Sequence, residues 1–252
     1  MPTPPPPPPA RSPRAPRPSG RRPAESTRDR LVAAAALEFA AHGFAGANVD
    51  RIARAARVNK AMIYYHFRSK AALYREILGD MFRAVCARVR GVAESAVTPE
   101  DKIRGFIRAI AAEAQARPHF PPIWFREIAE GGSHLDDSTL GDISAIVGML
   151  SAILREGVAA GRFEPVNPLL VHAGIVSPVL LFFASGRLRQ RIEKAGIANA
   201  AHVTAEEVVG HVERVTLALL AGVVPGRPAA RGAPRRRVGL PPSARQLKET
   251  LT

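Results

Sequence analysis

NVDRIARAARVNKAMIYYHFRSKAALY, residues 48–74, is the stretch that decides the fold class of this chain. Asn48 is a suitable N-cap for a short helix from Val49 to Ala56. The following break is short, and its last residue, Asn59, is placed to cap a second helix from Lys60 to about His66. Two short helices joined by so tight a turn, the second rich in polar and aromatic side chains, have the layout of a helix-turn-helix.

Helical periodicity continues on both sides of this stretch. On its N-terminal side, apolar residues recur at every fourth position in a helix predicted over Thr27–His42, which Gly43 ends. On its C-terminal side, Ser69 caps a long helix that ends near Ala96. Three helices therefore pack together at the start of the chain, and a fourth leads away from them.

The rest of the chain repeats the helical pattern. Further helices are predicted around residues 103–110, 121–130, 143–158, 168–187 and 204–221. Proline and glycine mark their ends, and no segment alternates polar and apolar residues as a half-buried strand does. The sequence predicts an all-α fold of about nine helices without a sheet.

Composition and charge divide the chain into four parts. Residues 1–24 form a Pro/Arg-rich arm, residues 225–252 form a basic tail, and both are predicted to be disordered. Between them we predict a helix-turn-helix domain at residues 25–70 and a helical domain at residues 71–224. Most of the formal net charge of +14 lies in the arm and the tail. The remaining chain therefore has a mildly basic front and a nearly neutral body.

Cysteine content and hydropathy exclude several classes of protein. The single cysteine, Cys86, excludes an intramolecular disulfide framework and a multi-cysteine zinc site, which favours a reduced, cytoplasmic setting. The N-terminal arm lacks the apolar core of a signal peptide. The most apolar run, residues 169–184, contains His172 and Pro178 and is too short to span a membrane. We predict a buried helix there and no membrane partner.

Residues 27–78 resemble the N-terminal motif of the TetR family of bacterial regulators. The likeness covers TRDRLVAAAALEFAAHGF, residues 27–44, and the stretch quoted first, whose Y-x-H-F-x-S-K ending is distinctive. The resemblance implies a transcriptional regulator, more often a repressor than an activator, that binds pseudo-palindromic operator DNA as a homodimer. It implies no catalytic activity and no cofactor.

Matched position by position, the resemblance assigns the start of the second short helix to base recognition. Lys60 can donate to guanine or to phosphate, whereas Ala61 and Met62 offer only apolar contact, for example with a thymine methyl group. Asn59 and Arg57 complete this part of the predicted surface. Family members often have glycine at the position of Arg57 and threonine or serine at that of Met62. If the backbone at Arg57 requires a positive φ, the arginine costs strain that a phosphate contact can offset.

The resemblance also implies contacts to the DNA backbone. Tyr64, Tyr65 and His66 carry groups suited to phosphate oxygens, and Tyr65 can also reach a base. The two tyrosines cannot both point inward on a short helix, whereas His66 either contacts phosphate or packs. Asn48 and Lys70 lie at helix N-termini, where backbone amides favour an anion.

The C-terminal half contains no catalytic motif such as a phosphate loop, G-x-S-x-G or H-E-x-x-H. His119, His134 and His172 lie too far apart in sequence to indicate a metal site. The resemblance instead implies a domain that binds a small-molecule effector and dimerises through its last two helices. The candidate pocket residues, which could also be plain core, are Phe106, Trp124, Phe125, Phe182 and Phe183.

Two other classes of function were weighed. The first is a helical ligand-binding protein or enzyme whose N-terminal helices only resemble a helix-turn-helix. The missing catalytic motifs disfavour an enzyme. A nucleoid-type protein would bind DNA without sequence preference and would need a strongly basic body, which residues 79–224 do not have. We therefore predict a sequence-specific regulator that a ligand releases from DNA.

Overall fold

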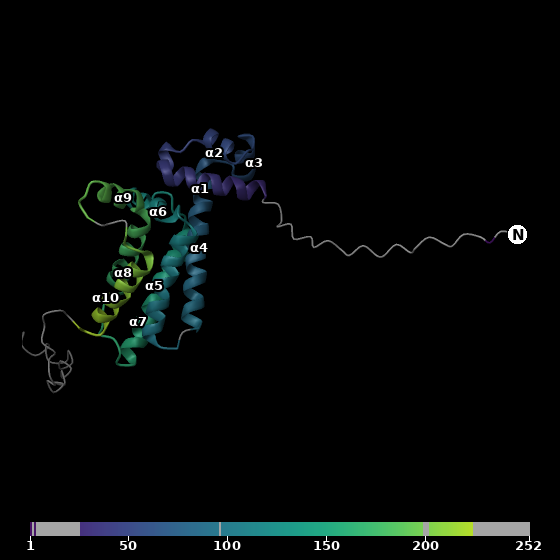
Figure 1. The fold of residues 1–252 in the computed structure, drawn as a ribbon. Coiled ribbons are helices and arrows are strands. Elements are labelled where there is room, and N and C mark those ends of the chain that lie inside the picture. Colours follow the sequence, from purple (N-terminus) through teal and green to yellow (C-terminus); the bar gives the residue numbers. More distant parts are fainter. Residues whose placement is uncertain (2, 4–25, 96, 199–201, 224–252) are drawn as a thin grey trace, which may run out of the picture. The chain divides into compact units, whose positions relative to one another are not determined.

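The computed structural model describes residues 1, 3, 26–95, 97–198 and 202–223, and within them every regular element is a helix. The all-α prediction is thereby confirmed (Figure 1). The ten helices are α1 (Thr27–Gly46), α2 (Val49–Ala55), α3 (Ala61–Phe67), α4 (Lys70–Ser95), α5 (Pro99–Ala116), α6 (Phe120–Ala129), α7 (Asp137–Ala159), α8 (Pro168–Ala184), α9 (Gly186–Lys194) and α10 (Ala205–Leu220).

The additional helix is α9, where the sequence predicted the end of one helix and a polar connection. The structure ends α8 at Ala184 and starts a separate helix at Gly186, bent by 63° from α8. Arg189 explains the bend, because its guanidinium lies over the Phe182 ring at 3.9 Å and donates to the hydroxyl of Ser185 at 2.9 Å. These contacts fold the basic segment back on the end of α8.

Contacts divide the chain into two compact units. The first comprises the described residues up to Arg83 together with Arg117–Leu140, and the second comprises Ala84–Ala116 and the described residues from Gly141 onwards. Helices α4 and α7 each contribute to both units. The predicted division of function at residue 70 stays a prediction. The arm at residues 1–24, apart from residues 1 and 3, and the tail at 225–252 lie outside the described residues.

In the first unit, α1 carries the apolar stripe that its periodicity predicts, and Leu31, Ala35 and Phe39 are buried on it. Gly43 interrupts α1 with a φ of 70°, a conformation that glycine adopts without strain. Arg126 of α6 donates to the carbonyl oxygens that this interruption leaves, at 2.9 Å to Phe39 and 2.6 Å to Ala40. The end of α1 is thus capped by a side chain from a distant part of the sequence.

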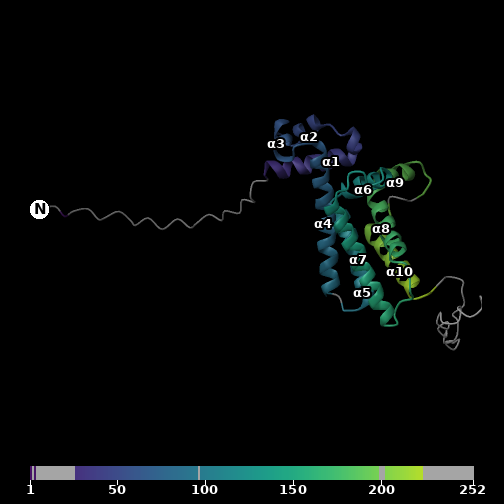
Figure 2. The same cartoon turned by 180° about the vertical axis from the view of Figure 1, so that it is seen from behind.

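In the second unit, α5, α8 and α10 pack side by side (Figures 1 and 2). Helix α8 buries Val171, Ile175 and Val179 against its neighbours. An ion pair of 2.7 Å between Arg108 of α5 and the nearly buried Glu213 of α10 links two of these helices. A buried carboxylate costs stability unless it is paired, so this bridge fixes which faces of α5 and α10 meet.

Among the described residues, α7 is long and apolar enough to cross a membrane, and so are α8 and α9 if the bent pair is counted as one segment. One or two such helices are weak evidence, because apolar core helices pass the same test. Leu150 and Ile153 of α7 are buried inside the protein, but only 28% of its most apolar stretch is buried there, so most of this helix is not enclosed by its own chain.

Candidate DNA-binding surface

Helix α3 is anchored by one face and uncovered on the other. Ile63 and Phe67 are buried with exposed fractions of 0% and 6%, whereas Tyr64 is 47% exposed and Tyr65 78% exposed. Both tyrosines therefore point away from the core of the first unit, and their hydroxyl groups are available to a partner. An exposed aromatic group with a polar tip suits a surface that contacts both the apolar and the polar parts of DNA.

At the start of α3, the structure shifts the roles of two predicted residues. Helix α3 begins at Ala61, one residue later than predicted, and its N-cap position is Lys60 and not Asn59. The side chain of Asn59 still accepts a hydrogen bond of 2.8 Å from the amide of Ala61. Lys60 forms an ion pair of 3.0 Å with Asp50 of α2, and this hydrogen bond raises the pKa of the lysine. Lys60 must share or exchange this partner to reach a base. Ala61 is exposed and Met62 is half-buried.

Three predicted contacts converge on one concave surface. Asn48, Tyr64 and Lys70 line a cavity of about 460 Å³ together with the residues that connect α1 to α2. Asn48 is the N-cap of α2, as predicted, and its side chain accepts a hydrogen bond of 2.7 Å from the amide of Asp50. The ammonium of Lys70 lies 4.7 Å from the centre of the Phe44 ring and donates to the Ala47 carbonyl. A polar concavity with a lysine suits a phosphate group.

Arg57 occupies the turn between α2 and α3 with a φ of 55°. The sequence analysis expected strain here if φ were positive, and φ is positive. An L-residue in this region costs about 1–2 kcal/mol relative to an ordinary conformation. Arg57 is exposed in this turn, directly before α3. Its contact with phosphate stays a prediction.

His66, like Lys70, is half-buried, whereas the other predicted polar contacts are exposed. The His66 ring lies 5.1 Å from that of Tyr65, and its Nε2 atom is buried without a hydrogen-bond partner among the described residues. Buried polar atoms in proteins normally form a hydrogen bond, so this nitrogen is suited to bind a water molecule or a partner. Both predicted alternatives, packing and phosphate contact, remain compatible with this position.

The structure adds residues to this surface that sequence reasoning missed. Glu38 of α1 accepts hydrogen bonds from the Asn48 amide and from Arg51 Nε, at 2.9 and 2.7 Å, and the bond from Arg51 lowers the pKa of its carboxyl group. Glu38 thereby fixes the start of α2. Arg68, at the C-terminus of α3, has a φ of 66° and is exposed. A basic residue directly after the helix was the only sequence signal for Arg68.

The predicted effector-pocket residues are divided between the two units, and their role stays a prediction. Trp124 and Phe125 belong to the first unit, where the Trp124 ring packs edge-on against Phe82 at 4.9 Å. Phe106 belongs to the second unit, is fully buried and lies near His172. Phe182 and Phe183 are neighbours at the end of α8, in the second unit. Phe183 lines a cavity of about 210 Å³ between α5, α8 and α10.

Two family models match the chain. The model of bacterial regulatory proteins of the tetR family matches residues 31–77, which include α2, α3, most of α1 and the start of α4. The model of the tetracyclin repressor-like C-terminal domain matches residues 99–217. Together they cover the helix-turn-helix and most of the remaining helices.

Individual relatives agree with the family models. The HTH-type transcriptional repressor KstR2 of Mycolicibacterium smegmatis is 30% identical over 142 residues, which are 56% of this chain and 69% of the relative. The HTH-type transcriptional regulator RutR of Escherichia coli K12 is 29% identical over 146 residues, 58% of this chain and 68% of the relative. The solved structure of KstR2 from Mycobacterium tuberculosis has the same fold, with a TM-score of 0.62 at 21% identity over 78% of this chain and 96% of that one.

Proposed function

Because this chain belongs to the TetR family of bacterial transcriptional regulators, we propose that it is a homodimeric repressor that a small-molecule ligand releases from a pseudo-palindromic operator. Membership makes it a DNA-binding regulator and not an enzyme. What we propose beyond family membership is that the chain represses transcription, forms a homodimer and responds to a ligand. Repression is supported by relatives that are themselves named as repressors. The proposed place of action is the bacterial cytoplasm.

The observation that carries the DNA-binding part of the proposal is the exposed face of α3. Tyr65 extends from it to 78% exposure, while Ile63 and Phe67 hold the helix in place from behind. We assign base recognition to Lys60 and Tyr65, because both carry hydrogen-bond donors and both face solvent. Asn48 and Lys70 would hold the register through phosphate groups.

The dimer part of the proposal is supported by the uncovered apolar faces of α8 and α10. Leu170 and Leu181 of α8 are 73% and 57% exposed, and Val215 and Leu219 of α10 are 55% and 50% exposed. Helices α8 and α10 pack together within the second unit. Exposure of these outer aliphatic side chains to water is unfavourable. They could be buried against the same face of a second copy, related by a two-fold axis.

The effector part of the proposal concerns the second unit. Its cavities include the one of about 210 Å³ beside Phe183 and an apolar one of about 590 Å³ lined mainly by the C-terminal half of α7 and the start of α8. A ligand that favours a conformation with a different separation of the two α3 helices would weaken operator binding. By linkage, operator DNA would weaken binding of that ligand by the same factor.

Selection of bound sequences from random DNA by the full chain tests this function. We expect an inverted repeat, whose half-site spacing reports the separation of the two α3 helices in a dimer. The Tyr65→Ala variant serves as the control, because it removes an exposed side chain from α3 and leaves the core intact. Enrichment of a single half-site would contradict the dimer, and recovery of no consensus sequence would contradict sequence-specific binding.

Once an operator is known, the ligand part can be tested separately. A panel of metabolites is screened for compounds that raise the melting temperature of the protein, and each such compound is titrated into the operator complex. We expect an inducer to lower operator affinity and to bind less tightly in the presence of operator by an equal factor. Binders that leave operator affinity unchanged throughout the panel would argue against induced release.

A further inference from the structure

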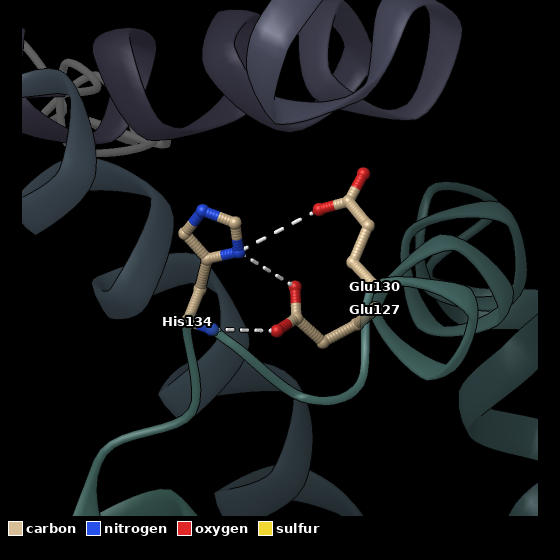
Figure 3. Close-up of side chains that lie close together, drawn as sticks. All are labelled: Glu127, Glu130 and His134. Atoms are coloured by element: carbon tan, nitrogen blue, oxygen red, sulfur yellow. Dashed lines mark hydrogen bonds and ion pairs between the residues drawn. The ribbon is translucent and has the colours of Figure 1, made fainter.

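The turn after α6 brings together three potential metal ligands. Figure 3 shows Glu127 and Glu130, from the end of α6, directed toward His134 in the following turn. One ligand atom from each residue lies within 4.8 Å of the other two. We propose that Glu127, Glu130 and His134 form a binding site for a divalent transition-metal ion such as zinc. This inference does not depend on DNA binding.

The spacing of the ligand atoms suits a small ion. His134 Nδ1 lies 3.2 Å from Glu127 Oε2 and 3.7 Å from Glu130 Oε2. Ligands at about 2.1 Å from a tetrahedral zinc ion are separated by roughly 3.4 Å, so these two separations need only small side-chain adjustments. The two carboxylates, whose ligand atoms lie within 4.8 Å of each other, would have to close on the ion. Imidazole nitrogen and carboxylate oxygen are both ordinary zinc ligands. In the bound form, Nδ1 supplies its lone pair and the imidazole proton resides on Nε2.

The charges of the cluster also favour a divalent cation. Two carboxylates face the same imidazole nitrogen, and one imidazolium ion can neutralise only one of them. Glu127 is completely buried, where an unneutralised charge is costly, whereas Glu130 is 41% exposed. Arg126, which is next to Glu127 in sequence, is instead committed to the carbonyl groups of α1. A divalent ion would neutralise both carboxylates at once.

Hydrogen bonds from neighbouring groups hold the proposed ligand Glu127 in position. Glu127 accepts hydrogen bonds from Tyr74 Oη at 3.1 Å and from the His134 amide at 2.7 Å. Such outer hydrogen bonds orient carboxylate ligands in metal sites. Ser133 Oγ, at 3.1 Å from His134 Nδ1, or a water molecule on the exposed side can complete the coordination.

The cluster is also packed against residues of the candidate DNA-binding surface in the same unit. The His134 ring lies 4.2 Å from that of Phe44 and 5.1 Å from that of Tyr74. Phe44 in turn lies under the ammonium of Lys70 at 4.7 Å. A bound ion that holds His134 in place would therefore also restrict Phe44 and, through it, Lys70, which is predicted to contact a DNA phosphate.

Titration of the full, untagged chain with Co²⁺ after treatment with a chelator tests the site. We expect one equivalent to bind with the visible absorption bands of low-symmetry Co²⁺ and to be displaced by Zn²⁺. Glu130→Gln and His134→Asn should each weaken binding at least about 10-fold. Glu130 is exposed, so its variant keeps the folded protein intact.

The chain provides matched controls, because two other histidines each pair with a single glutamate. His42 lies 3.4 Å from Glu38 and His202 lies 3.2 Å from Glu193. His42→Asn and His202→Asn should bind Co²⁺ as the unmodified chain does, and Zn²⁺ should raise their melting temperature equally. Absence of saturable binding, or equal binding by all variants, would overturn the proposal and leave an ion pair that only holds the turn.

Discussion

The outer faces of α3 and of α8 with α10 are both uncovered within their own units, but they differ in chemistry. On α3 the most exposed large side chains are Tyr64 and Tyr65, which end in hydroxyl groups. On α8 and α10 they are aliphatic, as at Leu181 and Val215. Water satisfies a tyrosine hydroxyl, whereas each exposed aliphatic side chain forfeits about 25 cal/mol per Å².

This difference shows that burial alone does not identify a partner. A face with hydrogen-bond donors can leave water for phosphates and base edges without losing hydrogen bonds. A face of leucine and valine gains only by meeting another apolar surface. The two helix faces therefore differ as the two proposed partners do, operator DNA for α3 and a second copy of the chain for α8 and α10.

The largest effect should come from charging the aliphatic face. The double variant Leu181→Glu/Val215→Glu places unpaired acids where the proposed dimer is apolar, so we expect a monomer in analytical ultracentrifugation. Operator affinity should fall about 100-fold or more, because two linked α3 helices bind far more tightly than one. Val97→Glu is the control, since Val97 is 87% exposed outside this face. A double variant that stays dimeric would place the interface elsewhere.

A smaller effect should follow from removing the aromatic donor of α3. Tyr65→Ala should lower operator affinity about 10- to 100-fold, the range for losing a hydrogen bond to a charged group or base. The melting temperature should not change, because the side chain is largely exposed. Tyr65→Phe separates the hydroxyl group from the ring in the same binding assay. Unchanged affinity of both variants would remove Tyr65 from the DNA contact.

The smallest effect should come from the strained turn that leads into α3. Arg57→Gly should raise the free energy of unfolding by about 0.5–1 kcal/mol, since glycine adopts the positive φ without strain but gives a more disordered unfolded chain. If Arg57 contacts a phosphate, operator affinity should fall and its salt dependence should decrease by about one ion.

Arg68→Gly is the matched control for the stability measurement, because Arg68 has a similar φ of 66° at the other end of α3. Chemical denaturation and a salt titration measure stability and DNA binding for both variants in parallel. Stabilisation of Arg57→Gly without any change in the salt slope would mean that the arginine contributes only strain.

Local sequence patterns predicted most of the fold. The apolar spacing in α1 and the cap at Asn48 predicted helix boundaries to within a few residues, and the cap predicted at Asn59 lies one residue before the N-cap position of α3. The family resemblance, in turn, implied strain at Arg57 if its φ were positive, and its φ is 55°. These features depend on neighbours at most a few residues away, and such spacings follow directly from helix geometry.

Tertiary packing decided the features that join distant residues. The ion pair of Lys60 with Asp50, the contact of Arg126 with α1, and the approach of Tyr74 to Glu127 arise only when separate helices pack. Even the short E-x-x-E-x-x-x-H pattern after α6 became a cluster only through the turn that follows the helix. The sequence by itself thus determined most of the helices and the segment on which the predicted DNA contacts lie. The partners of its charged groups depended on tertiary structure, because side-chain electrostatics act through space and not along the chain.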